Sequence, residues 1–100
     1  MEGLAQLINT VRSVKQSFNK KLYIEGLLLT MFDKRNRLSH QVAAEIHNHF
    51  GDQVFTTRIP RNVRLSESPS HGKTIMEYDI KSTGAQAYKA LALEFLKRQV

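Results

Sequence analysis

Three stretches of the chain carry the apolar spacing that is typical of amphipathic helices. Apolar side chains recur every three or four positions over residues 4–18, again over residues 38–50, and again over residues 82–98. Each pattern places its apolar residues on one stripe, which another part of the fold has to cover. The sequence therefore predicts three helices, and the first is expected to pack its stripe against a flat surface.

Residues that favour helix ends flank two of these stretches. Asn36 or Ser39 can cap the start of the second helix, and Gly51 stands where a left-handed residue commonly ends one. Ser82 can cap the start of the last helix, and the Lys-Arg pair at 97–98 suits a helix C-terminus. These residues fix the expected bounds of both helices.

Two apolar stretches between the helices are predicted to be β-strands. Residues 22–30 end in a continuous apolar run, which is typical of a strand covered on both faces, and residues 53–58 form the second strand. A strand, a helix and a strand of these lengths make a βαβ unit with parallel pairing. Because two strands would leave apolar edges unpaired, we expect an α/β fold that is the C-terminal portion of a larger, doubly wound, mostly parallel sheet.

Three connections complete the predicted layout. Residues 62–68 are expected to form a short helical turn closed by Pro69, and residues 73–79 an extended connection. The charged connections at 31–37 and 59–64 would both leave the sheet at the carboxyl ends of its strands. Ligands of open α/β sheets bind at that edge, so we expect the functional site there.

The charge of the chain points to a polyanionic partner. Fifteen Lys and Arg against nine Asp and Glu leave a net charge of +6. Four arginines of the two charged connections would converge at the sheet edge, and a guanidinium group binds phosphate without reading sequence. These four are Arg35, Arg37, Arg61 and Arg64. Few aromatic residues lie between them, which favours duplex DNA over single strands; a solvated basic surface is the alternative.

Other chemistry finds little support in the sequence. His40, His47 and His49 surround Glu45, but no two of these histidines have the i,i+4 spacing of a zincin helix, so a solvated helix face explains them better than a metal site. The 100 residues contain no nucleophile elbow, no P-loop and no cysteine. We therefore expect no catalytic residue, no metal ligand and no membrane segment, and a cytoplasmic location.

Several segments resemble the C-terminal part of the ParA/Soj-type chromosome and plasmid partitioning ATPases. The most specific is residues 59–72, Ile-Pro-Arg-Asn-Val-Arg-Leu-Ser-Glu-Ser-Pro-Ser-His-Gly, and residues 2–7 and 24–33 also match. The match continues through Tyr78-Asp79 to residues 84–88, so it covers essentially the whole chain.

The resemblance implies a deviant P-loop ATPase that binds ATP and Mg²⁺, dimerises around ATP and binds duplex DNA without sequence specificity. A ParB-type partner protein stimulates hydrolysis in that family, and the protein is associated with the nucleoid. The family's P-loop and its Mg²⁺-binding aspartates belong to an N-terminal part that these residues do not include. Residues 1–100 are therefore expected to be a C-terminal fragment of one ATPase domain of the P-loop NTPase type, inactive and without a bound cofactor when alone.

The resemblance also assigns roles to individual residues. Residues 30–32 and 59–62 resemble the loops that flank adenine and ribose; they are Thr30, Met31, Phe32, Ile59, Pro60, Arg61 and Asn62. Three arginines match positions that contact DNA phosphates, namely Arg35, Arg61 and Arg64. The chain departs from the family pattern at Ser68, Ile80 and Thr83, where alanine, proline and a basic residue are usual.

Two alternatives stay open. One is a stand-alone adaptor that binds DNA or a partner protein without ATPase activity. The other is a MinD-like membrane ATPase, but residues 91–98 are better explained as a packed final helix than as a membrane-binding one.

Overall fold

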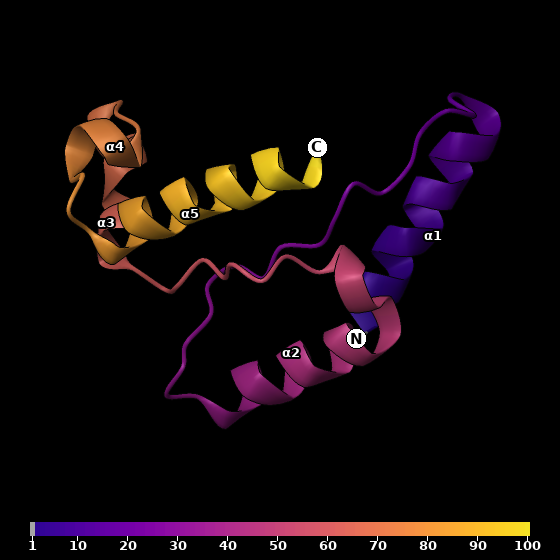
Figure 1. Ribbon diagram of the computed structural model, residues 1–100, viewed down its shortest axis with the longest axis horizontal. Coiled ribbons are helices and arrows are strands. Elements are labelled where there is room, and N and C mark those ends of the chain that lie inside the picture. The colour runs from indigo at the N-terminus through magenta and orange to yellow at the C-terminus, as the bar shows by residue number, and fades with distance from the viewer. Residues whose placement is uncertain (1) are drawn as a thin grey trace.

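The computed structural model describes residues 2–100 and consists of helices joined by extended segments. The helices are α1 (Glu2–Ser17), α2 (Arg37–Phe50), α3 (Val63–Glu67), α4 (Ile75–Tyr78) and α5 (Thr83–Arg98), with short 3₁₀ turns η1 (Gly51–Gln53) and η2 (Ser68–His71). In Figure 1 two extended segments cross the middle of the molecule, with α2 below them and α3, α4 and α5 above. None of the helices in residues 2–100 is long and apolar enough to span a bilayer.

The predicted helix caps are confirmed. The Asn36 side chain accepts a hydrogen bond from the Leu38 N–H at 2.8 Å, and the Gly51 N–H returns to the His47 carbonyl with a positive φ of 54°. The Ser82 hydroxyl accepts from the Ala85 N–H at 3.0 Å. Both ends of α2 and the start of α5 are therefore set by local residues that the sequence reveals.

The predicted mostly parallel sheet is wrong. Residues 2–100 contain no β-strand; the two segments run parallel but meet in only two isolated bridges, Leu27 with Val54 and Phe32 with Pro60. Between these bridges the first segment advances five residues and the second six, so a one-residue bulge interrupts the ladder. Two segments without further neighbours pair only marginally, and the doubly wound fold class is overturned for this chain.

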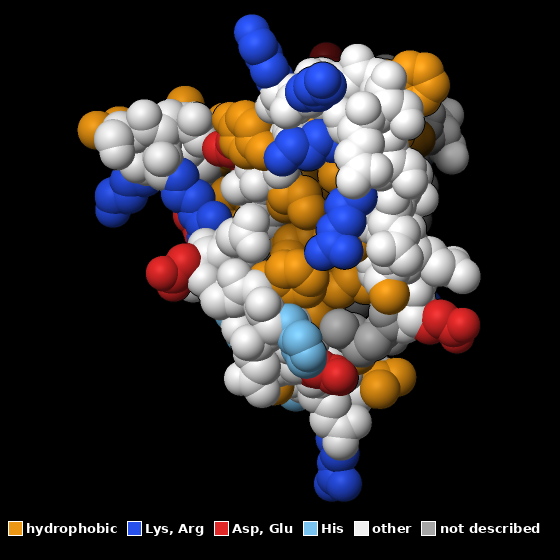
Figure 2. Space-filling view, turned by 90° about the vertical axis from the view of Figure 1, so that its right-hand side faces the viewer, with side chains coloured by type: hydrophobic (Ala, Val, Ile, Leu, Met, Phe, Trp, Pro, Cys, Tyr) orange, Lys and Arg blue, Asp and Glu red, His pale blue; other side chains and the backbone are white. Residues whose placement is uncertain are grey.

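Two smaller expectations also fail. Residues 73–79 are not extended, because Thr74 and Glu77 form a capping box that starts α4. The helix α1 does not press its stripe against a flat surface, since none of the residues of Glu2–Ser17 is buried. Figure 2 shows the side of the molecule on the right of Figure 1, where a strip of apolar side chains lies open with Lys and Arg gathered around its upper part.

The core lies between α2, the second extended segment and the start of α5. Its buried apolar residues are Ala43, Ile46, Val54, Phe55, Ile59, Ile75 and Ala85, and Ile59 is only 2% exposed. Two glycines allow the close packing around it. A Cβ at Gly26 would lie 2.5 Å from the Phe55 ring, and one at Gly84 would lie 2.5 Å from Leu65 Cγ. Because Ile59 is buried in this core, it fixes the position at which residues 60–63 begin.

Candidate functional site

Backbone hydrogen bonds join the two charged loops. The Phe32 N–H donates to the Ile59 carbonyl at 2.9 Å, and the Arg61 N–H donates back to the Phe32 carbonyl at 3.1 Å. One step earlier, the Ile59 N–H donates to the Leu29 carbonyl at 2.9 Å. The loops at 30–35 and 59–62 therefore lie side by side, as expected, although no sheet carries them.

Two clefts lie on either side of residues 60–63. The first has a volume of about 560 Å³ and is lined by Phe32, Asp33, Lys34, Arg35, Thr83 and residues 60–63. The second has a volume of about 470 Å³ and is lined by Thr30, Met31, Ile59, Leu65, Ser66, Tyr88 and the same residues 60–63. Every residue predicted to flank adenine and ribose lines one of these clefts. Their role in binding a nucleotide stays a prediction.

Met31 turns the first loop at the mouth of the second cleft. Its φ of 52° lies in the left-handed region, which residues with a side chain rarely adopt. Its side chain is 68% exposed, so packing against the core does not hold it there. Strained backbone of this kind often occurs at ligand sites, so the loop that contains Met31 is a candidate for ligand binding.

Phe32 is fixed by two neighbours that the sequence analysis did not assign to the site. The Arg58 guanidinium lies 4.6 Å from the centre of the Phe32 ring, and the His40 ring meets it edge-on at 5.2 Å. His40 Nε2 also lies 2.7 Å from the Lys34 carbonyl oxygen. His40 therefore braces the loop, and residues 2–100 hold no cluster of three metal-ligating side chains.

Arg35 and Arg61 lie together at the first cleft. Asp33 Oδ1 accepts the Arg35 N–H at 3.0 Å and pairs with Arg35 Nε at 3.4 Å. The pKa of Asp33 is lowered, first by that backbone hydrogen bond and then by the charges of Arg35 and Arg61. Desolvation opposes this shift. The cleft thus combines positive guanidinium groups with a carboxylate that stays ionised.

Arg64 is not brought to the same place. It lines neither cleft and instead pairs with Glu67 at 3.3 Å and with Asp79 at 3.4 Å. The pKa of Arg64 is raised, first by a hydrogen bond with Tyr78 and then by these two carboxylates. Its side chain is nevertheless 53% exposed, so part of the guanidinium group faces solvent. Arg37, at the start of α2, is exposed and also lines neither cleft.

Asn62 attaches the loop to two helices. Its Oδ1 accepts the Arg64 N–H at 2.8 Å and caps α3, and its Nδ2 donates to the Thr83 hydroxyl in the first turn of α5. Both contacts come from one side chain, so the position of the loop depends on the amide group. Thr83 occupies the position where a basic residue is usual in the resembling family.

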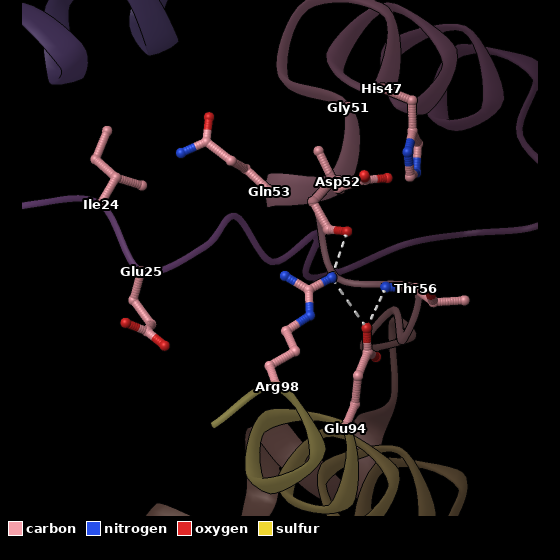
Figure 3. A pocket seen from close by; sticks show the side chains of 10 residues that line it. Ile24, Glu25, His47, Gly51, Asp52, Gln53, Thr56, Glu94 and Arg98 are labelled. Carbon is pink, nitrogen blue, oxygen red and sulfur yellow. Dashed lines mark hydrogen bonds and ion pairs between the residues drawn. The ribbon is translucent and has the colours of Figure 1, made fainter. Parts of the chain in front are cut away.

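A separate polar cleft of about 830 Å³ was not foreseen from the sequence (Figure 3). Glu94 and Arg98 of α5 reach across it to the second extended segment. Glu94 accepts the Thr56 N–H at 2.7 Å and the Thr57 N–H at 2.8 Å. Arg98 donates to the Val54 carbonyl at 2.9 Å. The i,i+4 spacing of Glu and Arg was visible in the sequence, but their partners 37 or more positions away were not.

The pKa of Glu94 lies well below its ordinary value. Desolvation raises it, but hydrogen bonds from Thr57 and Thr56 and the charge of Arg98 outweigh that cost and lower the pKa to about 2. The carboxylate is therefore ionised throughout the physiological range.

Comparison with known proteins places the chain in a family. The profile described as CobQ/CobB/MinD/ParA nucleotide binding domain matches residues 3–75. The chain is 52% identical over 99 residues to the chromosome partitioning protein ParA of Caulobacter vibrioides, covering 99% of this chain and 37% of that protein. It is 54% identical over 98 residues to the chromosome partitioning protein ParA of Myxococcus xanthus, covering 98% of this chain and 35% of the relative.

A third relative is the sporulation initiation inhibitor protein Soj of Bacillus subtilis. The two are 56% identical over 94 residues, which cover 94% of this chain and 37% of Soj. The chain thus spans little more than a third of the length of the curated relatives it matches. These matches confirm the resemblance, and the chain belongs to the CobQ/CobB/MinD/ParA nucleotide-binding family, among its ParA/Soj chromosome-partitioning members.

Proposed function

We propose that this chain supplies the adenine-side contacts to ATP and a sequence-independent DNA-binding surface in a ParA/Soj-type partitioning ATPase. The observation that carries the proposal is the backbone pairing of Phe32 with Ile59 and Arg61, which joins both charged loops around two clefts. ATP-dependent self-association, a ParB-type partner and a location at the nucleoid are parts of the same proposal, because they follow from the family.

The second cleft suits a flat, largely apolar base. Apolar lining comes from Met31, Pro60, Val63 and Tyr88, and Thr30 adds a polar group to the lining. Small-molecule sites commonly combine apolar walls with a few placed polar groups. These residues fit the adenine end of ATP. Residues 2–100 contain no cluster of three or more His, Cys, Asp or Glu side chains that could hold a metal ion.

The first cleft and its surroundings suit a phosphate backbone. Lys34, Arg35 and Arg61 lie along one opening, and the chain carries a net charge of +6. Guanidinium and ammonium groups that neutralise phosphates release counterions, which gives affinity without sequence preference. Arg64 joins this surface only through the exposed part of its side chain, because Glu67 and Asp79 hold the rest.

The test separates nucleotide binding from DNA retention in the native gene product. Arg35→Ala and Arg61→Ala are compared with Arg12→Ala, which removes an exposed arginine of α1 far along the chain from both loops. With ATP present, each cleft variant should weaken DNA binding and reduce the dependence of log affinity on log salt by about 0.9 per lost phosphate contact.

Binding of a fluorescent ATP analogue is measured on the same variants. Arg35→Ala should leave it unchanged, whereas Arg61→Ala should weaken it, because of these two arginines only Arg61 also lines the second cleft. The DNA proposal fails if both cleft variants bind DNA as the Arg12→Ala control does. The nucleotide proposal fails if Arg61→Ala binds the analogue with unchanged affinity.

A further inference from the structure

Methionine supplies all of the sulfur in this sequence. The 100 residues contain three methionines and no cysteine, so a peroxide meets thioethers here and no thiol. Met76, in α4, is 37% exposed, whereas Met31 is 68% exposed. Of the two methionines in residues 2–100, Met31 is therefore the one that an oxidant in solution reaches more easily.

Met31 lies between two hollows. It lines the second cleft, and it also lines a smaller hollow of about 210 Å³ that extends to Leu38 and Val42 of α2. Thr30 is the other residue that lines both hollows. The left-handed backbone at Met31 turns the loop at this point. A chemical change in the Met31 side chain therefore alters the lining at the place where the two hollows meet.

The lining around Met31 suits a thioether and not a polar group. Pro60, Val63 and Tyr88 contribute apolar lining on one side, and Leu38 and Val42 do so on the other. A methionine side chain is flexible and apolar, so it fits such surroundings. Its sulfoxide is polar and chiral, and the S=O oxygen has to stay hydrated or accept a hydrogen bond. A flat base that enters the second cleft would then displace that water without replacing its hydrogen bonds.

We infer that Met31 is an oxidation site, and that its conversion to methionine sulfoxide weakens binding in the second cleft. The inference rests on the proposed nucleotide function of that cleft. Hydrogen peroxide is the oxidant: the sulfur lone pair attacks one peroxide oxygen, the O–O bond breaks, and the other oxygen leaves with both protons as water. The sulfur loses two electrons and the peroxide gains them. Two thiols reverse the change, because they return the sulfide and form a disulfide and water.

Peroxide treatment of the native gene product, followed by peptide mass measurement, shows where oxygen is added. Cleavage after Lys and Arg places Met31 in the peptide 22–34 and Met76 in the peptide 74–81, so the gain of one oxygen atom is assigned to either residue. Met31 should be oxidised at least about twofold faster than Met76, in the order of their exposure. A bound non-hydrolysable ATP analogue should slow the oxidation of Met31 and leave that of Met76 unchanged. Equal or faster oxidation of Met76 would overturn the inference.

Affinity for a fluorescent ATP analogue is measured before and after peroxide, and each variant is compared with itself. Oxidation should weaken binding by the wild type about tenfold, the scale of one apolar side chain's contribution, and methionine sulfoxide reductase with a dithiol should restore it. Met76→Leu is the matched control and should lose affinity as the wild type does. Met31→Leu has no sulfur at this position and should keep its own affinity through the same treatment. Met31→Gln is polar without any oxidant and should bind about as weakly as the oxidised wild type.

The outcomes separate this inference from the proposed function. If peroxide weakens Met31→Leu as much as the wild type, another residue carries the effect and the inference is wrong. Unchanged affinity of a wild type whose Met31 is fully oxidised would also overturn it, while the proposed nucleotide function would stand. If the untreated wild type does not bind the analogue, the proposed nucleotide function fails and this inference fails with it.

Discussion

The side-chain amide of Asn62 donates to the hydroxyl of Thr83, so the loop between the two clefts is tied to the first turn of α5. The same Asn62 side chain caps α3 by accepting the Arg64 N–H. One residue therefore sets both the end of the loop and its distance from α5.

Two different substitutions of Asn62 distinguish its role as the cap of α3 from its bond to Thr83. Asn62→Ala loses both bonds and should lower the free energy of unfolding by about 1–2 kcal/mol, the usual cost of a lost helix cap. Asn62→Asp keeps the capping oxygen but loses the N–H donor to Thr83, so its stability should stay close to wild type while binding of a fluorescent ATP analogue weakens. Urea denaturation and nucleotide titration measure the two effects. Asn48→Ala, at an exposed position of α2, is the control, and equal stability of Asn62→Ala and this control would contradict the capping role.

Gly84 should tolerate no side chain. In Gly84→Ala the new Cβ would meet Leu65 Cγ at 2.5 Å, so α5 and α3 would have to separate, at a cost of about 1–3 kcal/mol. Gly3→Ala is the matched control, because no atom lies within 4 Å of its Cβ position in α1. The control should gain about 0.5–1 kcal/mol from the higher helix propensity of alanine. Thermal unfolding of both variants and of Gly84→Ala/Leu65→Ala checks the contact, since the double variant should recover part of the loss.

Glu94 should make the protein sensitive to acid. Its pKa is lowered to about 2 in the folded protein from 4.5, so its contribution to stability is fully present above pH 4.5 and is lost as the pH falls towards 2. The contribution is on the order of 2 kcal/mol, with allowance for the partial exposure of the side chain. Urea denaturation at pH 7, 4 and 3 should show that the free energy of unfolding of the wild type falls as the pH falls. The fall should be smaller in Glu94→Gln, and it should be unchanged in the control Glu45→Gln. Identical acid profiles for Glu94→Gln and wild type would show that the carboxylate does not hold the segment.

Arg64 should contribute to DNA retention through its exposed side while its ion pairs hold α3 near the end of α4. Arg64→Glu should abolish DNA retention while ATP binding survives, because a negative charge repels phosphate and the clefts do not include this residue. Asp79→Asn removes one ion-pair partner of Arg64 and should leave DNA retention equal or stronger. Filter retention of labelled duplex DNA with ATP measures both. Loss of ATP binding together with DNA retention in Arg64→Glu would assign Arg64 a structural role instead.

Local features of this fold could be predicted from the sequence, and non-local ones could not. Asn36 and Ser82 act on N–H groups two or three positions away, so their roles as caps are visible in the sequence. The capping box of Thr74 and Glu77 was equally local, but the apolar residues around it suggested an extended chain instead.

The failed strand prediction has a different cause. The apolar runs at 22–30 and 53–58 marked the two extended segments that run side by side, but only the second contributes buried residues. Pairing into strands depends on the register between distant residues, which one sequence does not reveal. For the same reason, the contacts of Glu94 with Thr56 and Thr57 could not be predicted, while the meeting of the loops at 30–35 and 59–62 followed from the order of the elements.

The extra residue between the two bridges also determines which way the second loop faces. Side chains of an extended chain point alternately to its two faces, so one added residue moves every side chain that follows to the opposite face. Pro60, and not Ile59, therefore lies opposite Phe32, and Ile59 turns into the core. Whether Arg61 faces a cleft or the interior thus depends on the number of residues before it, and a one-residue deletion in 55–57 would reverse its orientation without removing any arginine.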